Sequence, residues 1–197
     1  MNCIQEHFQT EIVIKHSRFI AEVFPVQTQS QARELLKEQK QKYFDSTHVV
    51  HAFVIGKNCE VLGMSDDGEP SGTAGRPVLD VLKGSGCTNI MLTVTRYFGG
   101  TLLGTGGLVK AYSDSAKAVL EIAKFEPLIE KTEFKFSLPY DMYEKVKYHF
   151  NHYHIEKLKE DFTENITING IIFAEEFDSF KTEIEELSNA RIKIQTC

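Results

Sequence analysis

The sequence predicts an α+β protein built from two domains, and three observations support this class. The 197 residues are 42% hydrophobic and 25% charged, which is the composition of an ordinary globular chain. Segments that alternate like strands are interspersed with segments that have helical periodicity. After residue 130 the predicted order is strand, helix, strand, strand, helix, strand, which is typical of a ferredoxin-like domain. We therefore predict domains at 1–130 and 131–197, with the boundary near 126–132.

The first domain is expected to contain both kinds of element in turn. Strands are predicted at 11–26 (a strand pair or one bent strand), 47–56, 59–66 and 89–100, and helices at 29–44, 76–86 and 104–123. The two strands on either side of Gly56-Lys57-Asn58 form a hairpin. The strand at 89–100 is almost continuously apolar, so we expect it to be buried on both faces. Residues 125–128 are expected to lead the chain out of the first domain and to link it to the second.

The second domain shows clearer patterns. Strands are predicted at 132–139, 153–162, 165–176 and 191–196, and helices at 140–150 and 177–190. Phe134, Phe136 and Leu138 alternate along the first of these strands, so they are expected to lie on one face of its sheet.

Charge and composition limit the function classes. The net charge is −6, with 13 basic against 15 acidic residues in 1–130 and 9 against 13 in 131–197. This balance argues against strong non-specific binding of nucleic acid, but a local basic site stays open. No apolar run is long enough for a membrane helix, so we expect no membrane partner. The four cysteines form no CxxC pair, and free thiols in a cytoplasmic protein fit them best.

The residues best suited to bind a ligand lie between Asp66 and Lys110. Two glycine-rich turns each open a predicted helix, where unpaired backbone N–H groups and a partial positive charge favour anions. The candidate anion-binding or RNA-binding residues are Gly72, Thr73, Gly75, Arg76, Arg96, Gly104, Thr105, Gly106, Gly107 and Lys110. A glycine-rich turn at a helix start often has no ligand and serves only to reverse the chain. Neither a Walker loop nor a dinucleotide fingerprint is present.

An acidic loop precedes the first of these helices. The recognition-loop candidates are Asp66, Asp67, Glu69 and Ser71, with His48, His51 and Tyr97 from neighbouring strands. The three carboxylates would repel phosphate. Solvated charges or ion pairs with Arg76 and Arg96 are the favoured interpretation, and a Mg²⁺ site or a cationic partner stays open as an alternative.

The histidines predict no metal site and the chain shows no catalytic motif. His48 and His51 are three apart in one strand, so they point to opposite faces, one towards the glycine loops and the other towards the core. His149, His152 and His154 straddle a helix end and a strand start. No HExxH, GxSxG or Cys–His arrangement is present, so we expect no cofactor and favour a non-enzymatic protein.

Two long blocks then resemble a known family. DDGEPSGTAGRPVLDVL, from Asp66, and VTRYFGGTLLGTGGLVKAYSDSA, from Val94, resemble the signature of the IMPACT family in its two-domain bacterial YigZ type. KHSRFIAEV and THVVHAF agree with earlier blocks of that family. The resemblance is dense over 6–122, and the second domain is similar by pattern. One departure is Leu102, where many relatives carry lysine.

The resemblance implies a fold and a role. It implies a first domain similar to the α/β sandwich of ribosomal proteins and a second domain similar to the last domain of elongation factor G. It also implies translation regulation, since eukaryotic relatives restrain the amino-acid-starvation response by competing for the activator of a kinase. We therefore expect binding of RNA, the ribosome or a translation factor through the Asp66–Lys110 surface. An enzyme acting on a phosphorylated small molecule and a pure protein-interaction module are the alternatives.

Overall fold

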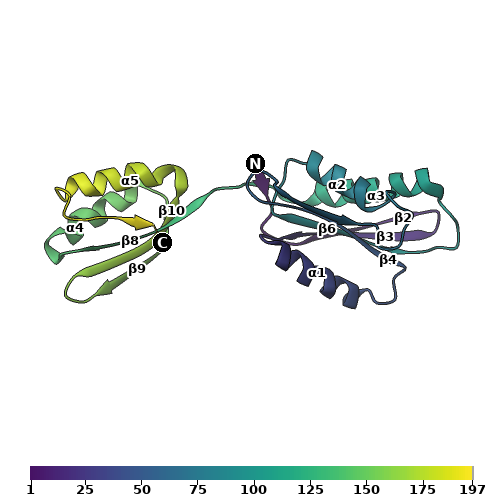
Figure 1. Ribbon diagram of the computed structural model, residues 1–197, viewed down its shortest axis with the longest axis horizontal. Helices are drawn as coiled ribbons and strands as arrows, with labels where there is room; N and C mark the ends of the chain where they lie inside the picture. The colour runs from purple at the N-terminus through teal and green to yellow at the C-terminus, as the bar shows by residue number, and fades with distance from the viewer. Residues whose placement is uncertain (197) are drawn as a thin grey trace. The chain divides into compact units, whose positions relative to one another are not determined.

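The computed structural model describes residues 1–196, and the chain divides into two compact units, Met1–Leu128 and the residues from Ile129 on (Figure 1). The division lies inside the 126–132 segment named above. Each unit has its own hydrophobic core. The predicted α+β class is confirmed.

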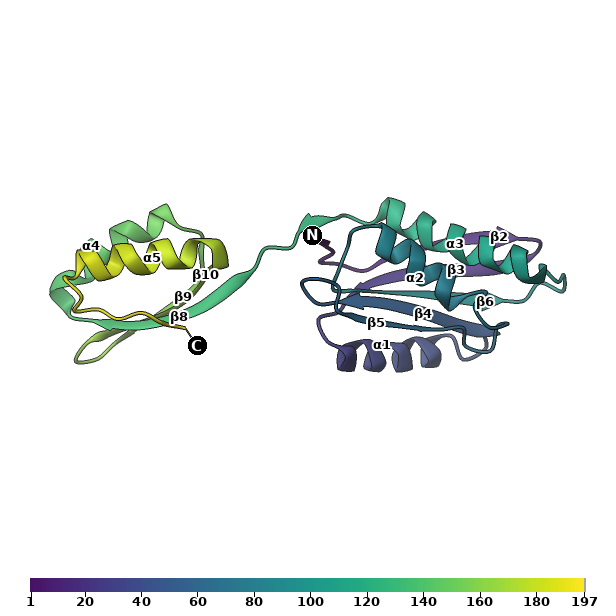
Figure 2. The same ribbon diagram turned by 45° about the horizontal axis from the view of Figure 1, so that its top comes forward.

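A five-stranded antiparallel sheet forms the centre of the first unit. Its order is β2 (Phe8–Ile14), β3 (Ser17–Pro25), β6 (Ile90–Tyr97), β4 (His48–Ile55), β5 (Val61–Ser65). Helix α1 (Gln29–Lys42) covers one face, and α2 (Gly75–Gly84) and α3 (Gly104–Ile122) cover the other (Figure 2). The predicted helices and the central strand β6, buried on both faces, are found as expected.

Local sequence explains where the helices and strands begin. The hydroxyl of Thr28 accepts a hydrogen bond from the amide of Gln31, and the side-chain oxygen of Gln31 accepts one from the amide of Thr28, so a capping box starts α1. The predicted strand pair at 11–26 becomes a hairpin, β2–β3, whose turn residues Lys15 and His16 have φ of 46° and 68°. Two positive φ angles in a row are what a tight two-residue hairpin turn requires.

A short sheet at the end of the first unit was not predicted. Strand β1 (Asn2–Cys3) pairs antiparallel with β7 (Glu126–Pro127), inside the segment expected to be a linker. The amide of Leu128 continues the pairing by donating to the carbonyl of Met1. Two residues are too short to show any periodicity, and Pro127 favours an exit, so the sequence pattern gave no signal for this strand.

The second unit is a four-stranded antiparallel sheet with two helices. Its elements are β8 (Lys131–Leu138), α4 (Tyr140–His149), a 3₁₀ turn η1 (Phe150–His152), β9 (Ile155–Phe162), β10 (Ile166–Phe173), α5 (Ala174–Leu187) and β11 (Gln195–Thr196). The strand order β11-β8-β10-β9 is that of the ferredoxin-like fold. Phe134, Phe136 and Leu138 all lie in its core, as predicted from their alternation.

Two boundaries in this unit differ from the sequence prediction. Strand β10 ends at Phe173, and Ala174–Glu176, expected to be strand, opens helix α5. Acidic residues in the first turn favour this start because they face the positive end of the helix dipole. The predicted strand at 191–196 is paired only at Gln195–Thr196, where it meets the edge of β8.

In the part of the chain that the structure describes, no helix is both long and apolar enough to cross a membrane. Cys3, Cys59 and Cys87 are free, and Cys197 lies outside the described residues.

Candidate functional site

The first glycine loop connects β5 to α2, and a carboxylate within the loop binds its backbone amides. The carboxylate of Asp66 accepts hydrogen bonds from the amides of Gly72 (2.9 Å), Ala74 (3.0 Å) and Gly75 (2.8 Å). Burial opposes ionisation, but these amides outweigh it and hold the pKa of Asp66 below its usual range. The amides predicted to bind an external anion therefore already bind an internal one.

The same loop needs glycine for close packing. An ideal Cβ on Gly75 would lie 2.7 Å from the carbonyl carbon of Ser65, at the end of β5. This close approach brings the end of β5 against the start of α2, so that Asp66 can reach the helix amides.

Asp67 anchors the loop to the rest of the sheet. One carboxylate oxygen lies 2.5 Å from Lys40 Nζ on α1, and the other accepts from the amide of Val49 at 2.7 Å. The carbonyl of Asp67 lies 2.7 Å from His48 Nδ1. Asp67 thus ties the acidic loop to α1 and β4.

Glu69 forms a buried ion pair with Arg96. Their side chains are 4% and 6% exposed, and Arg96 Nη1 lies 2.5 Å from Glu69 Oε1. The hydroxyl of Tyr112, on α3, donates to the same oxygen at 2.8 Å. Burial and the charge of Glu69 raise the pKa of Tyr112 well above its usual range, so it remains a donor. Of the three acids, Glu69 therefore forms the expected ion pair with Arg96, Asp67 forms an ion pair with Lys40 instead, and Asp66 binds backbone amides.

Arg96 lies at the centre of the site. It pairs across the sheet with Phe19 on one side and His48 on the other. Its guanidinium carbon is 5.5 Å from the ring centroids of both Phe19 and Phe98, and Nη2 lies 3.4 Å from the hydroxyl of Ser17. Nε is buried and has no hydrogen-bond partner among the described residues.

The second glycine loop differs from the first because it is open. Helix α3 begins at Gly104, whose φ of 73° favours glycine, and Thr105 and Gly106 follow on the exposed surface. Within residues 1–196 no side chain caps this helix start. Its first amides are therefore candidates to bind an anion.

A cavity of about 420 Å³ joins this helix start to the buried ion pair. It is lined by Thr47, His48, Glu69, Pro70, Arg96, Phe98, Leu102, Leu103, Gly104, Thr105 and Leu108. Apolar and polar side chains contribute equally to this lining, and Phe98 and Leu102 are 45% and 83% exposed at its edge. The cavity therefore offers an aromatic ring and a helix start to a ligand.

The other sequence candidates lie outside this cavity. His51 faces away from it, on the α1 side, where burial first and then the charge of Lys40 lower its pKa. His48 and His51 thus occupy opposite faces, as predicted. Tyr97 donates to Asp45 at 2.8 Å. Arg76, Lys110, Ser71, Thr73 and Gly107 do not line the cavity: Arg76 pairs with Asp80 on α2, Thr73 bonds to Pro70, and Ser71 and Lys110 are exposed.

Sequence reasoning missed Tyr112, Ser17 and Phe98. It also named Arg96 as a candidate to bind an external anion, whereas Arg96 is buried against Glu69. One signal was present: Arg96 alternates with Leu92 and Val94 along β6, so all three lie on the same buried face.

The fold and site define a class, a two-domain α+β protein with an open glycine-rich helix start on its first domain. Residues 15–120 match the Impact N-terminal domain. The chain is 38% identical to an IMPACT family member of Haemophilus influenzae, over 92% of this chain and 89% of that protein. It is 40% identical to IMPACT family member YigZ of Escherichia coli, over 64% of this chain and 63% of that protein.

A crystal structure described as a hypothetical protein aligns with a TM-score of 0.73 at 28% identity, covering 100% of this chain and 96% of that one. The chain therefore belongs to the IMPACT family, as its glycine-rich blocks indicated.

Proposed function

We propose that this chain is a non-enzymatic, translation-associated protein of the cytoplasm that binds single-stranded RNA in the cavity beside Gly104. Membership of the IMPACT family supports the link to translation. The observation that carries the RNA-binding part is the combination, in one cavity, of the exposed Phe98 ring and the uncapped start of α3.

A nucleotide offers the two groups that such a cavity fits. Its base can stack on an exposed aromatic ring, here Phe98, which contributes about 1–3 kcal/mol per base. Its phosphate can accept from the amides at Gly104 and Thr105, at a helix start that no side chain caps among the described residues, with the helix dipole in favour.

Electrostatics predict modest affinity. Arg96 is neutralised by Glu69, and Leu102, at the edge of the cavity, is uncharged at a position where the family resemblance implies lysine. With few free cations in the cavity, the binding should depend only weakly on salt compared with a strongly basic protein.

The enzymatic alternative has less support, because the acidic loop is already engaged. Asp66 holds helix amides, Asp67 holds Lys40 and Val49, and Glu69 holds Arg96. A Mg²⁺ ion at this loop would have to displace those contacts.

Fluorescence anisotropy with a labelled single-stranded RNA tests the proposal. Phe98→Ala should weaken binding about five- to 150-fold, the equivalent of one lost stacking contact. Phe44→Ala is the matched control, since Phe44 is 86% exposed and does not line the cavity. Leu102→Lys should strengthen binding. It should also make the slope of log affinity against log salt steeper by about one, as expected for one added phosphate contact.

Two outcomes would reject the proposal. Equal affinity of the wild type and Phe98→Ala would remove the cavity from RNA binding. Salt-independent capture of a translation factor, lost in Phe98→Ala while no RNA binds, would instead assign the surface to a protein partner.

A further inference from the structure

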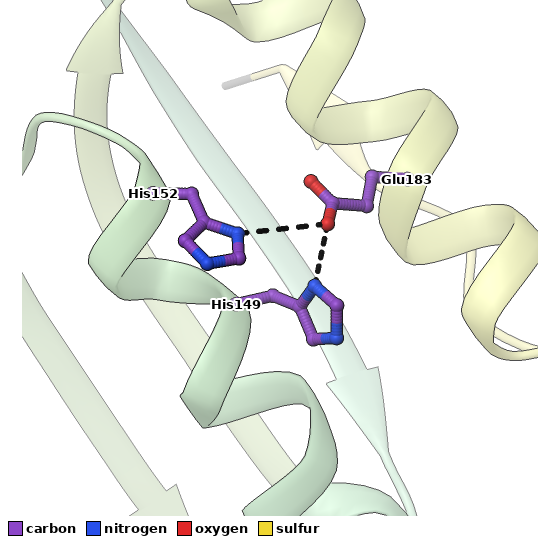
Figure 3. Close-up of side chains that lie close together, drawn as sticks. All are labelled: His149, His152 and Glu183. Atoms are coloured by element: carbon purple, nitrogen blue, oxygen red, sulfur yellow. Dashed lines mark hydrogen bonds and ion pairs between the residues drawn. The ribbon is translucent and has the colours of Figure 1, made fainter.

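A second cluster of chemically active side chains lies in the other domain, far along the chain from the cavity. His149, His152 and Glu183 bring three potential ligand atoms within 4.8 Å of one another (Figure 3). The sequence predicted no metal here, because the histidines were considered without Glu183, which is more than thirty residues away along the chain.

The geometry is convergent. His149 Nδ1 lies 2.5 Å from Glu183 Oε1, and His152 Nδ1 lies 3.8 Å from the same oxygen. Figure 3 shows both rings directed at the carboxylate. His149 ends α4 and His152 ends η1, and their spacing of three residues places them on one side of the chain.

We propose that His149, His152 and Glu183 form a site for a divalent transition-metal ion of the Zn²⁺ type. Two imidazole nitrogens and one carboxylate oxygen are ligands that Zn²⁺ and its neighbours prefer, whereas Mg²⁺ and Ca²⁺ prefer oxygen alone. Three protein ligands leave a fourth position for water.

The distances fit an ion with small adjustments. Ligand atoms around tetrahedral Zn²⁺ lie about 3.3 Å apart, given metal–ligand bonds of about 2.0–2.2 Å. The observed 2.5 Å and 3.8 Å lie on either side of this value, and all three ligand atoms lie within 4.8 Å of one another, so side-chain rotations would bring them to the required spacing. The ion would take the place of the hydrogen now shared between His149 and Glu183.

The surrounding residues hold the carboxylate in place. Tyr153 donates a hydrogen bond to Glu183 Oε2, the oxygen that does not face the histidines. Such an outer-shell bond orients a ligating carboxylate in metal sites.

The backbone beneath the site is fixed by the core. Phe150 and Tyr153 pack their rings on Phe180 of α5, with ring centroids 5.9 Å and 5.2 Å away. Phe180 and Ile184, on either side of Glu183 in the helix, are fully buried. The side chains of His149, His152 and Glu183 are 22%, 52% and 32% exposed, so an ion can reach them.

Calorimetry with Zn²⁺ on the full, tag-free chain tests the proposal. One ion should bind per chain, and His152→Ala and Glu183→Gln should each abolish or strongly weaken this binding. Tyr153→Phe should weaken it about ten- to 100-fold, as expected for loss of an outer-shell bond. His154→Ala is the control, because His154 pairs with Glu176 and does not belong to the cluster.

Absorption of the Co²⁺-substituted chain separates this site from the cysteines. The expected spectrum has the d–d bands of nitrogen and oxygen ligands and no thiolate charge-transfer band. A thiolate band, or Zn²⁺ binding unchanged in both His152→Ala and Glu183→Gln, would overturn the proposal. So would the absence of saturable Zn²⁺ binding, which would leave His149 and Glu183 as an ion pair only.

Discussion

The two glycine-rich helix starts of the first domain look alike in sequence and differ in structure. At α2 the amides of Gly72, Ala74 and Gly75 are taken by the carboxylate of Asp66. At α3 the start at Gly104 has no side-chain cap within the described residues and opens into a cavity. The helix-start amides therefore stabilise the loop at α2, whereas those at α3 can bind a ligand. The difference between the two is the carboxylate of Asp66, which lies beside the first helix start.

The largest expected effect concerns the ion pair that links the acidic loop to the cavity. Arg96→Ala should lower the free energy of unfolding by about 3–5 kcal/mol, because the buried charge of Glu69 would lose its guanidinium partner and keep only Tyr112 and the more distant His48. Chemical denaturation measures this loss. The double variant Arg96→Met with Glu69→Gln should recover part of it. A loss below about 1 kcal/mol, typical of an exposed pair, would contradict the buried role.

The next substitution would free the amides at the start of α2 by removing the carboxylate that binds them. Asp66→Ala should cost about 1.5–3 kcal/mol, the range for hydrogen bonds to a charged group, because three amides lose their acceptor. Added sulfate should then raise the melting temperature of the variant more than that of the wild type. Asp80→Ala, an exposed acid on α2, serves as the control and should show no such response. Equal sulfate effects on all three proteins would show that the open amides do not bind anions.

A smaller effect follows from the pKa of Asp66, which lies below its usual range in the folded chain. The carboxylate therefore contributes stability that is present above the unfolded pKa, near about 4, and is lost as pH falls through the lower folded pKa. Asp66→Asn should lack this part of the acid dependence. Denaturation midpoints from neutral to acid pH, compared between the two proteins, measure it, and parallel curves would contradict it.

The smallest expected effect is at Arg76, the other arginine named from the sequence. Its side chain is 61% exposed and pairs with Asp80 one turn along α2. Arg76→Ala should change stability by less than about 0.5 kcal/mol and leave RNA affinity unchanged, since Arg76 does not line the cavity. A clear loss of affinity in anisotropy would extend the binding surface to the first loop.

The sequence predicted the features that depend on residues close together in the chain, and it failed for features that depend on residues far apart in the chain. Periodicity located every helix and the long strands, because 3.6-residue and two-residue patterns record which face is buried. It could not find β1 and β7, whose pairing joins residues over 120 positions apart. The same limit applies to the site: Asp66, Asp67 and Glu69 were identified as important, but not which amide or guanidinium each one contacts.

The cluster in the second domain teaches the same lesson. His149 and His152 are visible as a pair with helical spacing, but the packing of α5 against α4 supplies Glu183. A third ligand that depends on tertiary packing leaves no local pattern in the sequence.

The pairing of β1 with β7 also sets the length of the tether between the two units. With Leu128 bonded to Met1 and Glu130 bonded to Ala174, only Ile129 lies between the last anchored residue of one unit and the first of the other. If residues 1–3 detached, the span from the end of α3 at Ile122 would add several residues, each reaching about 3.3–3.6 Å. A longer tether changes the effective concentration of two linked modules, so the pairing of the first three residues bears on the length of linker that is free.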